Sequence, residues 1–144
     1  MIIIGSDHAG YRLKEAIKKY LGEIGEVTED LGTYSEDSCD YPIFAERVAK
    51  RVVAGEAKGI LVCGSGIGVS IAANKVKGVR AALCMNSELA EMSRRHNDAN
   101  ILCIGAKYTD FREVKKMVNV FLTTEFEGAR HQRRVQEIKD IENK

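Results

Sequence analysis

The sequence has little of several features that identify other protein classes. Its 144 residues include no tryptophan and 1 proline, and aromatic residues make up 6% of the chain. No apolar run comes near the roughly 18 residues that a membrane-spanning helix needs, so we expect no membrane partner. The opening letters MIII run straight into GSDHAG, a pattern that predicts no signal peptide. A chain of this length is expected to form a single domain, residues 1–144, around one sizeable core.

The sequence also lacks an excess of charge of one sign, and its cysteines are not paired in close motifs. The 22 lysines and arginines nearly balance the 21 acidic residues, which gives a formal net charge of +1. Such a balance releases few counterions from a polyanion, so we expect no nucleic-acid partner. The cysteines stand at positions 39, 63, 84 and 103, with no C-x-x-C pair and no histidine at zinc-ligand spacing. Scattered thiols are typical of a reducing compartment, so we expect a cytoplasmic protein without a structural metal.

What the sequence does contain is a regular alternation of short apolar runs and longer helical patterns. The runs typical of strands cover residues 2–4, 26–32, 59–63, 79–84 and 100–105. The helical patterns cover about 13–21, 42–53, 67–75, 86–96, 110–122 and 127–141, with Asn86 or Ser87 and Asp110 as candidate caps. This alternation predicts an α/β fold: a single-domain, doubly wound, Rossmann-like, five-stranded parallel sheet with helices on both faces.

A glycine-rich loop follows the third expected strand. Cys63 ends that strand, and the loop residues after it are Gly64, Ser65, Gly66, Ile67 and Gly68. The spacing G-x-G-x-G differs from the dinucleotide motif G-x-G-x-x-G, and strand 79–84 ends without a carboxylate for a ribose. The G-K-[ST] of a Walker loop is absent, and Val69 stands where a cysteine phosphatase needs an arginine. These three interpretations are therefore disfavoured.

The loop is suited to binding an anion, or an oxyanion that forms during a reaction. Alternating glycines let the backbone turn with its N–H groups facing one concavity, backed by the positive end of a helix. The same field lowers the pKa of a thiol placed at a helix N-terminus. Cys63 is therefore a candidate base or nucleophile. The plain alternative, a small buried residue before a tight turn, stays open at this point.

Two polar residues follow the first strand directly. Asp7 and His8 stand there, and a parallel sheet should bring them to the same edge as Cys63, because ligands bind at the carboxyl ends of such strands. His8 is equally explained as a residue of the helix cap.

Two further groups lie on helices in the second half of the chain. His96 and Asn97 close a helix, where a histidine can simply complement the helix dipole. Arg130 and Arg134 share a helix face at i, i+4, and two guanidinium groups on one face suit a phosphate monoester. A solvated basic face or a weak nucleic-acid patch is the alternative. Together with the thiol and the loop, these residues favour proton transfer on a small phosphorylated metabolite.

Six sequence blocks resemble a known family, in order and over essentially the whole chain. They are GSDHAGYRLK, DLGTYSEDSCDYPIFA, ILVCGSGIGVSIAANK, GVRAALC, SRRHNDANIL and EGARHQRRV. They resemble the ribose/galactose isomerase family, which includes type B ribose-5-phosphate isomerases and galactose-6-phosphate isomerase subunits. The resemblance implies interconversion of ribose 5-phosphate and ribulose 5-phosphate through an enediolate, in the pentose phosphate pathway, without metal or cofactor. It also implies a homodimer or a tetramer whose active sites are shared between subunits.

The resemblance implies a role for each motif residue. Cys63 resembles the base that moves a proton between C2 and C1, His96 the acid that opens the furanose ring, and Ser65 a hydrogen-bonding group near the thiol. The other residues resemble substrate contacts: Gly64, Gly66, Ile67 and Gly68 around the enediolate oxygens, Asp7 and His8 at ring hydroxyls and the phosphate side, Asn97 on the sugar, and Lys107, Arg130 and Arg134 on the phosphate. The two arginines would reach over from the partner subunit.

Two positions depart from the pattern of some family members. Val69 stands where those members have a glutamate base, and they lack a cysteine at position 63, so this chain fits the thiol subgroup. Lys107 replaces an arginine, which keeps the charge but loses the bidentate fork. Two alternatives stay open: a six-carbon substrate such as galactose 6-phosphate or allose 6-phosphate, and a non-catalytic module that binds a sugar phosphate or a nucleotide.

Overall fold

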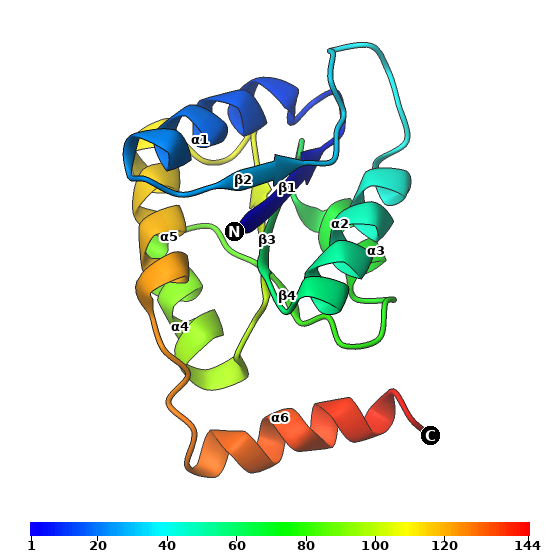
Figure 1. Ribbon diagram of the computed structural model, residues 1–144, viewed down its shortest axis with the longest axis vertical. Helices are drawn as coiled ribbons and strands as arrows, with labels where there is room; N and C mark the ends of the chain where they lie inside the picture. Colours follow the sequence, from blue (N-terminus) through cyan, green and yellow to red (C-terminus); the bar gives the residue numbers. More distant parts are fainter.

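The structure, a computed structural model, describes every residue from Met1 to Lys144. Its strands are β1 (Ile2–Ser6), β2 (Thr28–Asp30), β3 (Lys58–Cys63), β4 (Ala81–Leu83) and β5 (Ile101–Gly105). Its helices are α1 (Tyr11–Glu23), α2 (Tyr41–Gly55), α3 (Ile67–Ala73), α4 (Ser87–Asn97), α5 (Phe111–Thr123) and α6 (Arg130–Ile141). Strands and helices alternate along the chain as expected, and α6 follows as an additional helix (Figure 1).

The strands form one parallel sheet in the order β2-β1-β3-β5-β4. This order confirms the predicted doubly wound α/β fold. Because the strands are parallel, their carboxyl ends lie at one edge, where Ser6 pairs with Val62 and Cys63 pairs with Gly105. The chain changes direction across the sheet between β1 and β3, which is where ligands bind in open α/β sheets. The loops after these two strands are therefore placed to form a site.

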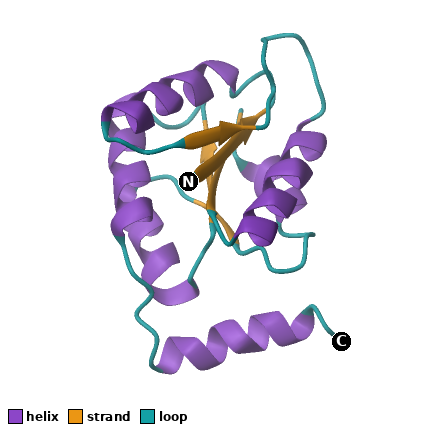
Figure 2. Ribbon diagram, in the orientation of Figure 1, coloured by secondary structure: helices purple, strands orange, loops and turns teal.

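Alternate side chains of each strand enter two separate cores, one on each face of the sheet. Ile2 and Ile4 belong to the core under α1, α4 and α5, whereas Ile3 belongs to the core under α2 and α3. The helices accordingly flank the sheet on both sides (Figure 2). Burial on both faces explains why the central strands are apolar at nearly every position instead of alternating with polar residues.

Element boundaries follow local signals where such signals exist. Asn86 Oδ1 accepts a hydrogen bond from the Leu89 amide at 2.9 Å, and Asp110 Oδ1 accepts one from the Glu113 amide at 3.0 Å. These bonds confirm Asn86, rather than Ser87, as the cap of α4, and Asp110 as the cap of α5. The edge strands β2 and β4 are shorter than their apolar runs predict, because each is paired along one side only.

Helix α6 begins later than the sequence pattern predicts. It starts at Arg130 and not at residue 127, because Gly128 and Ala129 have φ angles of 71° and 52°. This left-handed turn redirects the chain, and α6 lies across the end of the molecule opposite the loop 31–40 (Figure 1). None of the helices combines the length and the apolar character that crossing a bilayer requires.

Candidate active site

A cavity of about 500 Å³ opens at the carboxyl edge of the sheet. It is lined by seven residues expected from the sequence: Asp7, Cys63, Gly64, Ser65, Ile67, Gly68 and Lys107. Its remaining walls are Ala9, Tyr41, Ile71 and Tyr108. The sheet thus brings Asp7 and Cys63 together at one edge, as the parallel arrangement of β1 and β3 requires.

Cys63 lies at the junction of β3 and the glycine loop. The residue is only 5% exposed, and it lines the cavity. The amide of Gly66 donates a hydrogen bond to Cys63 Sγ at 3.1 Å. A backbone donor aimed at sulfur is a favourable partner for negative charge on that atom. Cys63 therefore lines the cavity, and at least one fixed dipole points at its sulfur.

The loop has this shape because it is pressed against the end of β5. Gly66 has a φ angle of 77°, and a Cβ there would lie 2.9 Å from the Gly105 nitrogen. A Cβ on Gly105 would in turn lie 2.5 Å from the Ser65 carbonyl oxygen. Both positions need glycine, because backbone meets backbone at distances that leave no room for a side chain.

Ser65 makes a hydrogen bond within the loop that follows Cys63. Its Oγ accepts a hydrogen bond from the Ile67 amide at 3.2 Å, while the Gly66 amide supplies the donor to the Cys63 sulfur. Serine hydroxyls near the start of a helix commonly bond the backbone two residues on. The following helix, α3, is 7 residues long and shorter than expected. The Gly66 amide is therefore the loop donor that points at the thiol.

Asp7 and His8 have structural partners near the cavity. Asp7 is buried, and its Oδ1 accepts a hydrogen bond from the Gly10 amide at 2.9 Å, which fixes the turn into α1. His8 is half-buried and does not line the cavity. Its Nδ1 accepts a hydrogen bond from the Cys39 amide at 3.2 Å. In a neutral His8 ring the proton therefore lies on Nε2, which leaves that nitrogen available as a donor.

Lys107 and Tyr41 both line the cavity. The Lys107 amide donates to the Gly64 carbonyl at 3.0 Å, and its exposed side chain lines the cavity. Tyr41 was not expected from the sequence; its ring packs so closely on Gly68 that a Cβ there would overlap it. The available signal was its position at the start of α2. Helix N-termini in such folds point to the carboxyl edge of the sheet, where ligands bind.

The remaining expected site residues lie at the other edge of the sheet. α4 begins beyond the carboxyl end of β4 and runs back, so its last residues, His96 and Asn97, lie beside the amino end of β5. Arg130 and Arg134 are exposed on α6 at the same end of the molecule (Figure 1). A single chain therefore does not bring these four residues to the cavity that contains Cys63.

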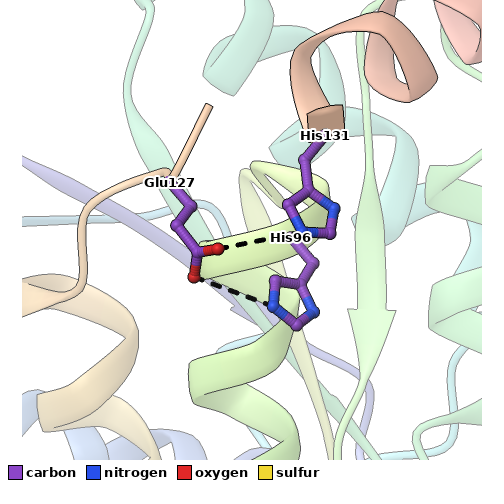
Figure 3. A group of neighbouring side chains, drawn as sticks. All are labelled: His96, Glu127 and His131. Carbon is purple, nitrogen blue, oxygen red and sulfur yellow. Dashed lines mark ion pairs between the residues drawn. The ribbon is translucent and has the colours of Figure 1, made fainter. Parts of the chain in front are cut away.

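His96 forms a cluster with Glu127 and His131, neither of which was expected as a site residue. The two imidazole rings stack with centroids 4.2 Å apart and planes inclined by 11°. Glu127 Oε2 lies 3.8 Å from His96 Nε2, and Glu127 Oε1 lies 3.8 Å from His131 Nε2 (Figure 3). Burial is the main cause that lowers the pKa of His131, and the nearby His96 and Arg130 lower it further, which favours the neutral form of His131. The only signal for His131 was its place inside the basic segment 128–134.

Comparison with known proteins places the chain in a family. A family model described as Ribose/Galactose Isomerase matches residues 2–138. The chain belongs to this family. Ribose-5-phosphate isomerase B of Escherichia coli (strain K12), for example, is 44% identical over 144 residues, covering 99% of this chain and 97% of that protein. The ribose/galactose isomerase membership that the six sequence blocks predicted is therefore confirmed.

Solved structures similar to this ribose/galactose isomerase have the same fold. Ribose-5-phosphate isomerase B of Clostridium thermocellum superposes with a TM-score of 0.97 and 49% identity, covering 99% of this chain and 97% of that one. The Mycoplasma genitalium enzyme, solved with bound ribulose-5-phosphate, has a TM-score of 0.95 and 43% identity, covering 99% and 96%. These likenesses confirm the expected isomerase class and the α/β fold.

Proposed function

We propose that this family member interconverts ribose 5-phosphate and ribulose 5-phosphate, within pentose phosphate metabolism, with Cys63 as the base. The observation that carries the proposal is the Gly66 amide bonded to Cys63 Sγ at 3.1 Å at the wall of a cavity of about 500 Å³. Further support comes from the relatives: the E. coli protein is named as a ribose-5-phosphate isomerase, and the M. genitalium enzyme was solved with ribulose-5-phosphate.

The chemistry moves protons within the sugar and needs no redox cofactor. A Cys63 thiolate would take the proton from C2 of the open-chain aldose. The electron pair of that C–H bond would form the C1–C2 double bond, and the C1 oxygen would become negative. Transfer of the C2 hydroxyl proton to that oxygen, and return of the first proton to C1, give the ketose. The amides of loop 64–68 would stabilise the enediolate oxygens, because preorganised donors act most strongly where charge develops.

The acid and the phosphate ligands would come from a second copy of the chain. His96, Asn97, Arg130 and Arg134 lie at the amino edge of the sheet, away from the cavity. In a homodimer, or in a tetramer built from it, this edge of one subunit would close the cavity of its partner. His96 would then protonate the ring oxygen, Asn97 would contact the sugar, and the two guanidinium groups would hold the phosphate.

Residues of the cavity's own subunit would complete the contacts. Asp7 and the His8 Nε2–H would face the ring hydroxyls and the phosphate side, and Lys107 would add positive charge near the phosphate. The backbone of Gly64 and Ile67 would belong to the enediolate nest. All four cysteines are free, which supports the expected cytoplasmic location.

Replacing the thiol tests the base directly. Cys63→Ala should lower kcat by about 10³-fold or more, because general-base catalysis contributes about 10²–10⁴-fold. Circular dichroism and urea unfolding should show an intact fold. The matched control is Cys84→Ala, which removes a buried thiol that does not line the cavity and should retain kcat. Near-normal turnover in Cys63→Ala would contradict the assignment of the base.

Measuring isomerisation of several sugar phosphates decides between the candidate substrates. We expect kcat/KM of the wild-type protein to be higher for ribose 5-phosphate than for galactose 6-phosphate or allose 6-phosphate. A preference for either six-carbon sugar would replace the pentose assignment. Heat released on binding ribose 5-phosphate without formation of a ketose would instead indicate a non-catalytic binding module.

A further inference from the structure

The cluster of His96, Glu127 and His131 contains a buried nitrogen without a partner. The His131 side chain is 8% exposed, and its Nε2 makes no hydrogen bond. Glu127 Oε1 lies 3.8 Å from this nitrogen, which is beyond hydrogen-bond reach. Buried polar atoms in proteins are nearly always satisfied, so an unpartnered ring nitrogen that faces other ligand atoms points to a bound group.

The three side chains are close enough to share one ion. One ligand atom from each of them lies within 4.8 Å of the other two. Figure 3 shows the carboxylate beside the edges of both rings. Bonds from zinc to nitrogen and oxygen are about 2.0–2.2 Å, so ligand atoms around one ion stand about 3–4 Å apart. Small side-chain rotations are therefore enough to bring all three onto one centre.

We propose that His96, Glu127 and His131 form a binding site for one divalent transition-metal ion of the zinc class. Two imidazoles and a carboxylate are a ligand set that zinc, cobalt(II) and nickel(II) accept, whereas magnesium and calcium prefer oxygen ligands alone. Three protein ligands leave one tetrahedral position for water.

Two features of the cluster shape how the ion is held. Because the rings are stacked, their nitrogen lone pairs run nearly parallel, and each ring must turn about its Cβ–Cγ bond. That torsion has broad minima, so the turn is easy. Arg95 donates to Glu127 Oε2 at 3.0 Å, which leaves Oε1 for the ion on the His131 side. Glu91 lies 3.4 Å from Arg95 and offsets its positive charge.

Occupation of this site inhibits the isomerase in the proposed mechanism. A His96 nitrogen bound to metal has no proton to give to the ring oxygen, and the ring is held toward Glu127 instead of the substrate. This consequence rests on the proposed function, in which His96 is the acid. The binding of the ion does not rest on it, so the two are measured separately.

Cobalt(II) is the probe, because it takes up the geometry of zinc and absorbs visible light. The full chain, treated with a chelator and dialysed, is titrated with cobalt chloride, and zinc is then added to displace the cobalt. We expect one cobalt per chain, with the intense visible bands of four-coordinate cobalt and no sulfur-to-cobalt band in the near ultraviolet. Affinity should fall about 100-fold or more in His131→Gln and in Glu127→Gln, since even indirect partners of a metal contribute 10–100-fold.

The controls separate this cluster from other places where a metal could bind. Glu137 is exposed on α6, the helix that carries His131, and Glu137→Gln should retain the wild-type affinity for cobalt. Glu127 is an exposed loop residue, so its variant tests the site even if His131→Gln unfolds. No binding at millimolar cobalt, equal affinity in all variants, or a thiolate band that disappears in Cys39→Ser would overturn the proposal. Metal binding with undiminished isomerase activity would support the metal site and count against His96 as the acid.

Discussion

Gly66 is held in a conformation that other residues adopt only with strain. Its φ angle is 77°, and a Cβ there would lie 2.6 Å from Leu83 Cδ1 and 2.9 Å from the Gly105 nitrogen. The leucine methyl group can move aside, but the strand backbone of Gly105 cannot. The position of the amide that meets Cys63 Sγ therefore depends on the absence of a side chain at this one residue.

Gly66→Ala is expected to lower both stability and turnover. A residue other than glycine in the left-handed backbone conformation lowers the free energy of unfolding by about 1–3 kcal/mol, which urea unfolding would detect. The displaced amide would lose its contact with Cys63, and kcat should fall about 10²-fold, comparable to the loss of one oxyanion donor. Gly22→Ala is the matched control, because a Cβ there meets nothing within 4 Å. The Gly22→Ala variant should be more stable to unfolding by about 0.5–1 kcal/mol and should retain kcat. Full activity in Gly66→Ala would contradict the role given to the loop.

At the scale of elements, a buried ion pair joins α1 to β2. Lys14 is fully buried, and its Nζ donates to Asp30 Oδ1 at 2.8 Å and to the Thr33 carbonyl at 2.6 Å. Lys18 adds an ion pair to Asp30 at 2.8 Å. Burial by itself raises the pKa of Asp30, but hydrogen bonds from the two lysines and from the Gly32 amide outweigh it. The pKa of this carboxyl therefore lies below its ordinary value.

This ion pair makes the stability of the fold depend on pH in a defined direction. Because the folded pKa of Asp30 is lowered, its contribution is complete above the unfolded pKa near 4 and is lost as pH falls through the folded pKa. Asp30→Asn should lower the free energy of unfolding by about 3 kcal/mol at neutral pH, and the difference should shrink in acid. Urea unfolding from neutral pH to about pH 3 measures this. Asp37→Asn, at an exposed position, should show no such effect, and a difference that is constant with pH would contradict the prediction.

Elements with a chemical signal at their ends could be predicted from the sequence, and others could not. Asn86 and Asp110 cap α4 and α5 because a side-chain oxygen reaches an amide three residues on, which is a local event. The start of α6 depends on positive φ angles at Gly128 and Ala129. A helical hydrophobic pattern carries no information about such a turn, so the pattern predicted a helix from residue 127.

At the scale of the whole molecule, the expected site residues fall into two groups at opposite edges of the sheet. Cys63 and its loop lie at the carboxyl edge, and His96 with Arg130 and Arg134 lies at the amino edge. This arrangement follows from the fold, because a helix that connects parallel strands must return to the starting edge. A site that uses both groups therefore needs two copies of the chain.

Mixing two inactive variants tests the proposed site shared between two chains. Cys63→Ala and the double variant Arg130→Ala/Arg134→Ala should each be nearly inactive alone. After subunit exchange, half of the dimers are hybrids with one intact site, so about a quarter of wild-type activity should return. Native mass spectrometry confirms the exchange, and each variant mixed with itself is the control. No recovery despite demonstrated exchange would count against shared sites.

The sequence by itself determined the parallel α/β fold, the glycine loop after Cys63 and the family. These depend on hydrophobic period, on backbone freedom at glycine and on motif order, all of which are written locally along the chain. Only the tertiary structure decided that Tyr41 forms a wall of the cavity, that the Ser65 hydroxyl bonds the Ile67 amide, and that His131 stacks on His96. Some of these contacts join segments that are distant in the sequence, and in others a polar side chain has several possible hydrogen-bond partners. Both kinds are decided by the packing of the complete chain.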